Sequence, residues 1–176
     1  ETASPMPMTP GARGLMQMGL NLRGKDAVLD DVMPLIETLS DVKLKTEADF
    51  SSRPPAGINE SELLALIDRS TMACNAVAVC ECVAMGHRFG LPLSQMATIL
   101  NFGSAWSKVS EIILPALASH SVPQLAHTLE EAKTDIAKSV RYAKQIGVPL
   151  TLPNTLIDFL HYALIAPDGQ RTDFGA

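Results

Sequence analysis

The stretch 59–90 limits the possible folds more than any other part of the sequence, because it contains no proline and is too long for an ordinary surface helix. Asn59 can cap the start of a helix, and Gly90 followed by Pro92 can end it. At about 1.5 Å per residue, the predicted helix is roughly 45 Å long. We therefore expect one long helix around which the remaining chain is arranged.

The middle of this predicted helix has apolar or small side chains on every side. The run extends from Met72 to Met85, and only the polar Asn75 and Glu81 interrupt it. A helix that is apolar all round is buried by other helices. The run is shorter than the ~18 clean apolar residues of a membrane span, so we expect a central helix and no membrane partner.

Charge and cysteine usage exclude several functional classes. The chain of 176 residues has a net charge of −5 and no basic run, which argues against a nucleic-acid partner. The three cysteines lie in the predicted helix without the spacing of a zinc site, at positions Cys74, Cys80 and Cys82. We predict no metal site. Buried free thiols and the lack of a visible signal peptide predict a cytoplasmic location.

The N-terminal part has the pattern of a small βαβ unit. Residues 1–12 are a proline-rich linker, Leu15–Leu22 alternates like a strand, Asp26–Leu39 has helical spacing, and Val42–Leu44 resembles a second strand. Two strands alone do not form a stable sheet. We expect this piece to be the remnant of a larger sheet that the chain does not contain; the alternative is an independent cap on a helical bundle.

The remaining sequence predicts further helices, at 93–101, 105–119 with a kink at Pro115, 122–147, and from Thr151 or Asn154 to Ala166. The predicted fold class is mainly α: a helical bundle around one long central helix, with a short N-terminal βαβ remnant. We divide the chain into residues 1–56, the linker and residual βαβ piece of a missing cofactor domain, and residues 57–176, a helical dimerisation and substrate domain.

Individual residues give few signs of chemistry. Glu81, in a buried helix, is expected to satisfy neighbouring backbone or polar groups, and Trp106 is expected to anchor the core. Asp135 and Lys138 stand three residues apart, where opposite charges meet on the solvent side of a helix. No glycine-rich phosphate loop follows a strand, so no dinucleotide fingerprint is present.

Four short motifs follow one another along the chain: Asn75–Glu81, Gly86–Pro92 with Ile99–Asn101 and Gly103–Trp106, Asp135 with Lys144–Leu150, and Asp173–Phe174. In this order they resemble the C-terminal part of the β-hydroxyacid dehydrogenases, the 3-hydroxyisobutyrate and 6-phosphogluconate dehydrogenase superfamily. The resemblance covers nearly the whole chain and is strongest over residues 75–174.

The resemblance implies an enzyme with an N-terminal Rossmann domain for NAD or NADP and a helical domain that pairs in a dimer. A hydride passes between C4 of the nicotinamide and the β-carbon of a hydroxy acid. A lysine in a K-x-x-N-N motif acts as acid and base, and an S-G-G loop holds the substrate carboxylate, as backbone N–H groups at glycine turns favour anions. The cofactor of this chain would be NAD or NADP, bound mainly by a domain that the chain lacks.

The family's catalytic lysine position falls on Ala65, and its two asparagine positions fall on Asp68 and Arg69. Alanine cannot transfer a proton, so the catalytic residue of this chain is unknown. Arg69 can bind a carboxylate with two parallel hydrogen bonds, but it does not lose a proton at ordinary pH. We therefore expect Arg69 to bind substrate.

Two further family motifs are only partly kept. Thr9-Pro10-Gly11 stands where the S-G-G loop is expected, and Pro10 removes one backbone donor. In the lysine-aspartate motif, Thr134 replaces the lysine and Asp135 matches. The predicted substrate cleft is lined by Thr9, Gly11, Asp68, Arg69 and Asp135.

These observations leave three hypotheses. The first is the helical domain of a β-hydroxyacid dehydrogenase-like oxidoreductase that is not competent without a Rossmann domain. The second is a non-catalytic helical interaction module derived from that scaffold, and the third is an unrelated helical bundle. Whether the chain is an enzyme stays open. We also expect a homodimer, because a helix that is apolar all round needs more neighbours than this chain supplies.

Overall fold

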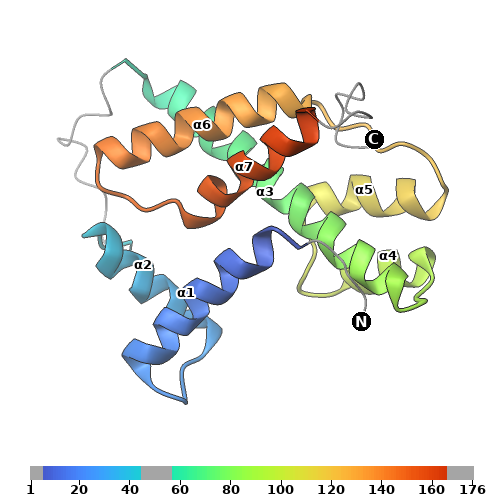
Figure 1. Cartoon of the computed structure of the whole chain (residues 1–176), viewed down its shortest axis with the longest axis horizontal. Coiled ribbons are helices and arrows are strands. Elements are labelled where there is room, and N and C mark those ends of the chain that lie inside the picture. Colours follow the sequence, from blue (N-terminus) through green and yellow to red (C-terminus); the bar gives the residue numbers. More distant parts are fainter. Residues whose placement is uncertain (1–5, 45–56, 166–176) are drawn as a thin grey trace.

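The structure is a computed structural model that describes residues 6–44 and 57–165, and in this part of the chain it is built only of helices and connections (Figure 1). The elements are α1 (Met8–Arg23), the 3-10 helix η1 (Leu29–Asp31), α2 (Val32–Ser40), α3 (Glu60–Arg88), α4 (Leu93–Phe102), α5 (Lys108–Ala118), α6 (Leu129–Gln145) and α7 (Thr151–Ile165). The prediction of a mainly α fold is confirmed.

Helix α3 is the long central helix that the sequence predicts. Its 29 residues form one continuous element, and the side chain of Asn59 caps it by accepting a hydrogen bond of 2.8 Å from the backbone N–H of Glu62. The helix ends where Gly90 takes a positive φ of 82°. Among the described elements, α3 packs against α1, α4, α5, α6 and α7 (Figure 1).

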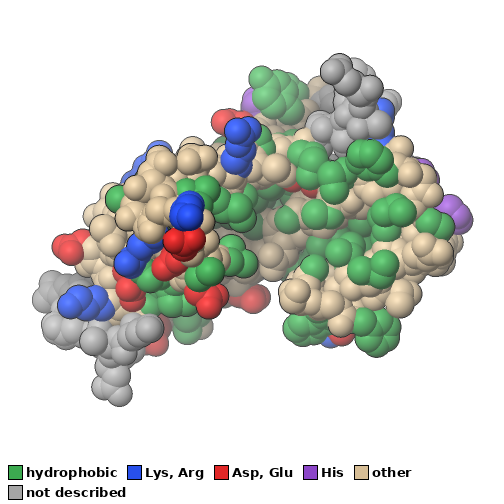
Figure 2. Space-filling model, turned by 90° about the horizontal axis from the view of Figure 1, so that it is seen from below, with side chains coloured by type: hydrophobic (Ala, Val, Ile, Leu, Met, Phe, Trp, Pro, Cys, Tyr) green, Lys and Arg blue, Asp and Glu red, His purple; other side chains and the backbone are tan. Residues whose placement is uncertain are grey.

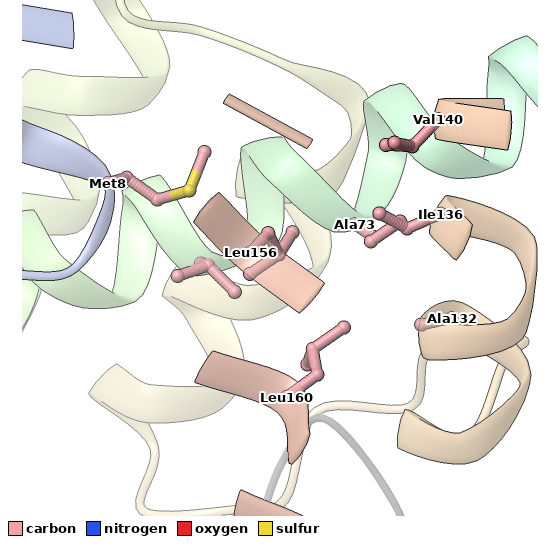
Figure 3. Packing of buried hydrophobic residues seen from close by; sticks show 8 residues of the cluster. Met8, Ala73, Ala132, Ile136, Val140, Leu156 and Leu160 are labelled. Atoms are coloured by element: carbon pink, nitrogen blue, oxygen red, sulfur yellow. The ribbon is translucent and has the colours of Figure 1, made fainter. Parts of the chain in front are cut away.

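The largest core lies between α3, α6 and α7, with one residue from the start of α1 (Figure 3). Its buried members are Met8, Ala73, Val77, Ala132, Ile136, Val140, Leu156 and Leu160. The small Ala73 of α3 lets α6 approach closely, so that Ile136 is completely buried. Smaller clusters join α3 to α4 and α5. Because Met8 belongs to the main core, α1 is anchored in the bundle; the domain division at residue 56 stays a prediction.

Helix α3 is not covered on all sides within the described part of the chain. Leu64 and Ile67 are 60% and 53% exposed, and Cys80 and Cys82 are exposed, which corrects the prediction of three buried thiols. Only Cys74 is partly buried. By length and composition α3 could cross a membrane, but central helices of bundles have the same properties, and α3 packs against five other helices.

The predicted βαβ remnant is wrong. Residues 15–22 lie inside α1, and residues 42–44 form neither helix nor strand. Leucine, methionine and glutamine dominate residues 15–22, and these residue types favour helices, whereas the β-branched and aromatic residues typical of strands are missing there. Pro10 falls in the first turn of α1, where a missing N–H is tolerated.

Several predicted helix boundaries also shift. The predicted helix 26–39 becomes η1 followed by α2, and α5 starts only after Ser107, whose side chain accepts a hydrogen bond from the N–H of Ser110. Likewise α6 starts after Thr128 rather than near Val122. The predictions for residues 1–5, 45–56 and 166–176, including the Asp173–Phe174 motif, concern positions outside the described residues.

Candidate functional site

A charged pair joins α3 to α6 at the candidate site. Nε of Arg69 donates a hydrogen bond of 2.6 Å to Oδ2 of Asp135, and Nη2 donates a longer one of 3.4 Å to Oδ1. The two side chains are 31% and 12% exposed. Beside this pair, the hydroxyls of Ser70 and Ser139 share a buried hydrogen bond of 2.6 Å between the same helices. The register of α3 against α6 is therefore fixed by polar contacts as well as by the core.

This geometry leaves one edge of the guanidinium available. Asp135 occupies the edge formed by Nε and Nη2, so the edge formed by Nη1 and Nη2 can still bind a carboxylate with two parallel hydrogen bonds. The hydrogen bond with Asp135 raises the pKa of Arg69, which keeps the guanidinium charged. Asp135 thus holds Arg69 in one orientation, which lowers the entropy lost when a ligand binds.

Arg69 faces a pocket of about 360 Å³, at the small end of the range for ligand pockets. The other lining residues all come from α6 or the loop before it: His127, Glu130, Glu131, Thr134, Asp135 and Lys138. Their spacing of three or four residues puts them along one side of the helix. The pocket is therefore a groove along α6 to which α3 contributes one side chain.

The acidic residues of this groove are already engaged. Oε2 of Glu131 accepts hydrogen bonds of 2.8 Å and 3.1 Å from the backbone N–H and the hydroxyl of Thr128, and these bonds lower the pKa of Glu131. Oε1 of Glu130 lies 3.9 Å from Nζ of Lys133. Asp135 is buried and pairs with Arg69, so the expectation that it meets Lys138 on the solvent side is wrong. Arg69 and Lys138 give the groove its cationic groups.

Two of the predicted cleft residues, Thr9 and Gly11, lie in the first turn of α1 and contact other parts of the bundle. The hydroxyl of Thr9 donates to Oε2 of Glu81 at 3.2 Å, and the backbone N–H of Met8 donates to Oε1 of Glu81 at 2.6 Å. Gly11 packs against Leu152 of α7, where an added Cβ would approach to 3.1 Å. Glu81 follows Arg69 by twelve positions, or about 18 Å along the helix. Thr9 and Gly11 are thus separated from the Arg69 groove in this structure.

The other positions that correspond to the family's K-x-x-N-N motif, Asp68 and Ala65, lie on α3 near Arg69. Asp68 is exposed and does not line the groove, although its charge contributes to the raised pKa of Arg69. Ala65 is partly buried, one helical turn before Arg69. Of the five predicted residues, the structure brings Arg69 and Asp135 together. The missed groove residues could have been found from their spacing relative to Asp135 on one helix.

Comparison with protein families assigns most of this bundle. Residues 65–176, more than half of the chain, match the model of a family described as NAD-binding of NADP-dependent 3-hydroxyisobutyrate dehydrogenase. The chain belongs to this family. A comparison with curated proteins found no match. The resemblance inferred from the sequence is therefore confirmed, and the helical region that holds Arg69 and Asp135 is the region shared with these dehydrogenases.

The family description names NAD binding, but the described residues contain no dinucleotide site of the Rossmann type. No β-strand occurs in residues 6–44 and 57–165, so they form no strand–glycine loop–helix site for a diphosphate. The N-terminus of α6 beside the groove is capped by Thr128 and Glu131. No His, Cys, Asp or Glu cluster suited to a metal ion occurs in the described residues.

Proposed function

We propose that this chain is the helical substrate-binding and dimerisation domain of an NAD(P)-dependent 3-hydroxyacid dehydrogenase-like oxidoreductase. Membership of the 3-hydroxyisobutyrate dehydrogenase family supports the reaction class. The guanidinium edge of Arg69, held in place by Asp135 beside a small groove, supports the binding of a short hydroxy acid through its carboxylate. In this proposal NAD or NADP is bound mainly by a separate domain, and the chain alone does not turn over substrate.

The proposed chemistry assigns a limited role to this chain. The nicotinamide accepts a hydride from the carbon that carries the hydroxyl, while the hydroxyl proton must pass to a base. Arg69 orients the substrate but remains protonated, so it is not this base. Residue 65 is an alanine and does not supply the base either. The base comes from another residue of the groove or from outside the chain.

Ala65 is also the observation that favours the second hypothesis, a non-catalytic helical module derived from the same scaffold. Such a module would keep the bundle and its self-association while losing proton transfer. Both hypotheses place this chain in the cytoplasm without nucleic-acid or membrane partners, as the sequence predicts. They differ in whether the groove beside Arg69 still recognises a hydroxy acid.

The first experiment is a titration of the chain with 3-hydroxyisobutyrate, followed by NMR of the backbone amides. We expect shifts in residues along the groove, and binding about 10- to 100-fold weaker in Arg69→Gln, because a charged pair of hydrogen bonds is lost. Arg141→Gln is the matched control, since Arg141 is exposed on α6 and stacks on Tyr142. Thermal unfolding shows whether each variant is still folded.

The methyl ester of 3-hydroxyisobutyrate is the matched control ligand, because it keeps the hydroxyl and lacks the negative charge. Equal binding of ester and acid would refute carboxylate recognition by Arg69. The non-catalytic module would then be the remaining hypothesis. A second measurement follows nicotinamide absorbance after the chain alone is mixed with NAD or NADP and substrate. We expect no change, and turnover by this chain alone would contradict the proposed location of the cofactor site.

A further inference from the structure

The sequence from Phe89 to Ser107 contains no charged residue, although Arg88 and Lys108 stand at its two ends. This stretch includes the whole of α4 and the turns on either side of it. Among the described elements, α4 packs only on α3 and α5, so it lies at the edge of the bundle (Figure 1). An edge helix normally has charged residues on its open side. The uncharged stretch therefore requires an explanation.

Large apolar side chains project from this stretch into solvent. Phe102 is 90% exposed, Phe89 and Ile99 are each 69% exposed, and Trp106 and Leu91 are about half exposed. We call these five residues the α4 face. Figure 2 shows hydrophobic side chains spread over the half of the molecule that contains α4 and α5, with few charged side chains among them. Trp106 is thus a surface residue, which corrects the expectation that it anchors the core.

The exposed apolar area is large enough to matter for association. An aromatic side chain presents about 150–250 Å², so the exposed fractions of Phe89, Phe102 and Trp106 together leave roughly 300–500 Å² in water. The largest apolar patch of a typical monomer covers about 300–600 Å² and is often functional. With Ile99 and Leu91 added, the α4 face approaches the ~800 Å² that each partner buries in a standard interface.

A pocket of about 350 Å³ adjoins the α4 face. It is lined by Asn75, Ala78, Val79 and Cys82 of α3, Leu100 of α4, and residues 104–107. Trp106 belongs to both the face and the pocket, and a hydrogen bond of 3.0 Å from its indole Nε1 to Glu111 fixes its orientation. A cavity of about 150 Å³ admits benzene, so this pocket has room for a phenyl side chain.

We propose that a second copy of this chain docks on the α4 face, with Phe102 of each copy entering the pocket beside Trp106 of the other. This inference deepens the dimerisation role proposed above by naming its surface. In a two-fold interface the same patch must carry both the projecting group and its receptor, and the α4 face provides an exposed phenyl ring next to an apolar pocket. The chain has a net charge of −5, and two copies meet here without placing like charges opposite each other.

Trp106 is the only tryptophan of the chain, so its fluorescence reports on this surface alone. We expect the emission to shift to shorter wavelength as the concentration rises, in parallel with a dimer mass in sedimentation velocity. Phe102→Ser should weaken dimerisation by about 100- to 1,000-fold, because two central aromatic anchors are lost for each dimer. Phe102 is almost fully exposed, so the monomer fold does not depend on it.

Tyr162→Ser is the matched control, because Tyr162 is an aromatic residue of α7 that is 70% exposed and lies outside the α4 face. It should leave the dimer unchanged. Ala78→Leu fills the pocket from within and should weaken the dimer while Phe102 is intact.

A monomer at all concentrations, or equal effects of Phe102→Ser and Tyr162→Ser, would overturn the proposal. A Trp106 shift that requires lipid vesicles rather than high protein concentration would also overturn it, in favour of a membrane surface. Binding of 3-hydroxyisobutyrate to Phe102→Ser, followed by NMR, separates this proposal from the Arg69 site. Retained binding by a monomeric variant supports both proposals, whereas a dimer that binds no hydroxy acid refutes only the proposed substrate.

Discussion

The carboxylate of Glu81 connects the long helix to the first helix of the chain, and its removal should release α1. Glu81 is 6% exposed, and it accepts hydrogen bonds from the backbone N–H of Met8 at 2.6 Å and from the hydroxyl of Thr9 at 3.2 Å. Both donors belong to the first turn of α1, where backbone N–H groups have no partner within the helix. A carboxylate at this end also interacts favourably with the helix dipole.

The expected size of the effect follows from these contacts. A hydrogen bond to a charged group contributes about 1.5–3 kcal/mol, and the longer bond from Thr9 contributes less. The interaction with the helix dipole adds about 0.3–1 kcal/mol. Since α1 can detach locally and so limit the loss, we expect Glu81→Ala to reduce the free energy of unfolding by about 2–4 kcal/mol. The isosteric Glu81→Gln keeps one acceptor oxygen and should lose about half as much.

Urea unfolding gives the total change, and hydrogen exchange shows where it arises. In Glu81→Ala the amides of α1 should exchange roughly 30- to 1,000-fold faster, while those of α4 and α5 change little. Asp158→Ala is the control, because Asp158 is an exposed acid of α7 and should matter by less than about 0.5 kcal/mol. A loss below about 0.5 kcal/mol in Glu81→Ala, or equal acceleration in all helices, would refute this account of how α1 is held.

Three further predictions concern other contacts. A double-mutant cycle with Arg69→Ala and Asp135→Ala should give a coupling of about 1–2 kcal/mol in urea unfolding, since the pair is only partly buried; a value near zero would contradict the fixed guanidinium. Thr128→Ala removes the cap of α6 and should destabilise the chain by about 1 kcal/mol in the same assay. Burial raises the pKa of the Cys74 thiol from 9.0 to about 11. At pH 8 the alkylation of Cys74 should therefore be about 100-fold slower than that of an ordinary thiol, because the thiolate is the reactive form. Mass spectrometry of the alkylated protein should show that this rate increases up to about pH 11.

The long helix was predictable because independent signals agree on its bounds. Asn59 caps it, Gly90 ends it, and nothing between them interrupts a helix of this length. Its exposure was not predictable, since composition does not show which sides of a helix have neighbours. In α1, the alternating apolar residues predict a strand, but so short a pattern does not distinguish the two-residue period of a strand from the 3.6-residue period of a helix. The segment is helical because leucine and methionine have a high helix propensity.

Sequence motifs predicted the residues of the site but not the contact between them. Arg69 and Asp135 were named from separate motifs, and their contact required the packing of α3 on α6, which no local pattern specifies. The capping motif of α6 was present in the sequence as Thr128 followed by Glu131, and it would have placed the start of this helix correctly. The expectation that Glu81 satisfies backbone or polar groups is confirmed, but no local signal identified Met8 and Thr9 as its partners.

The groove beside Arg69 has an uneven construction that bears on how its ligand preference could change. Helix α6 and the loop before it supply all but one of its lining residues, so altering several of them would disturb α6 and its cap. The opposite helix contributes a single guanidinium from a partly exposed position. In the proposed binding mode this guanidinium holds the carboxylate, so a single substitution at Arg69 would remove that contact without redesigning the bundle.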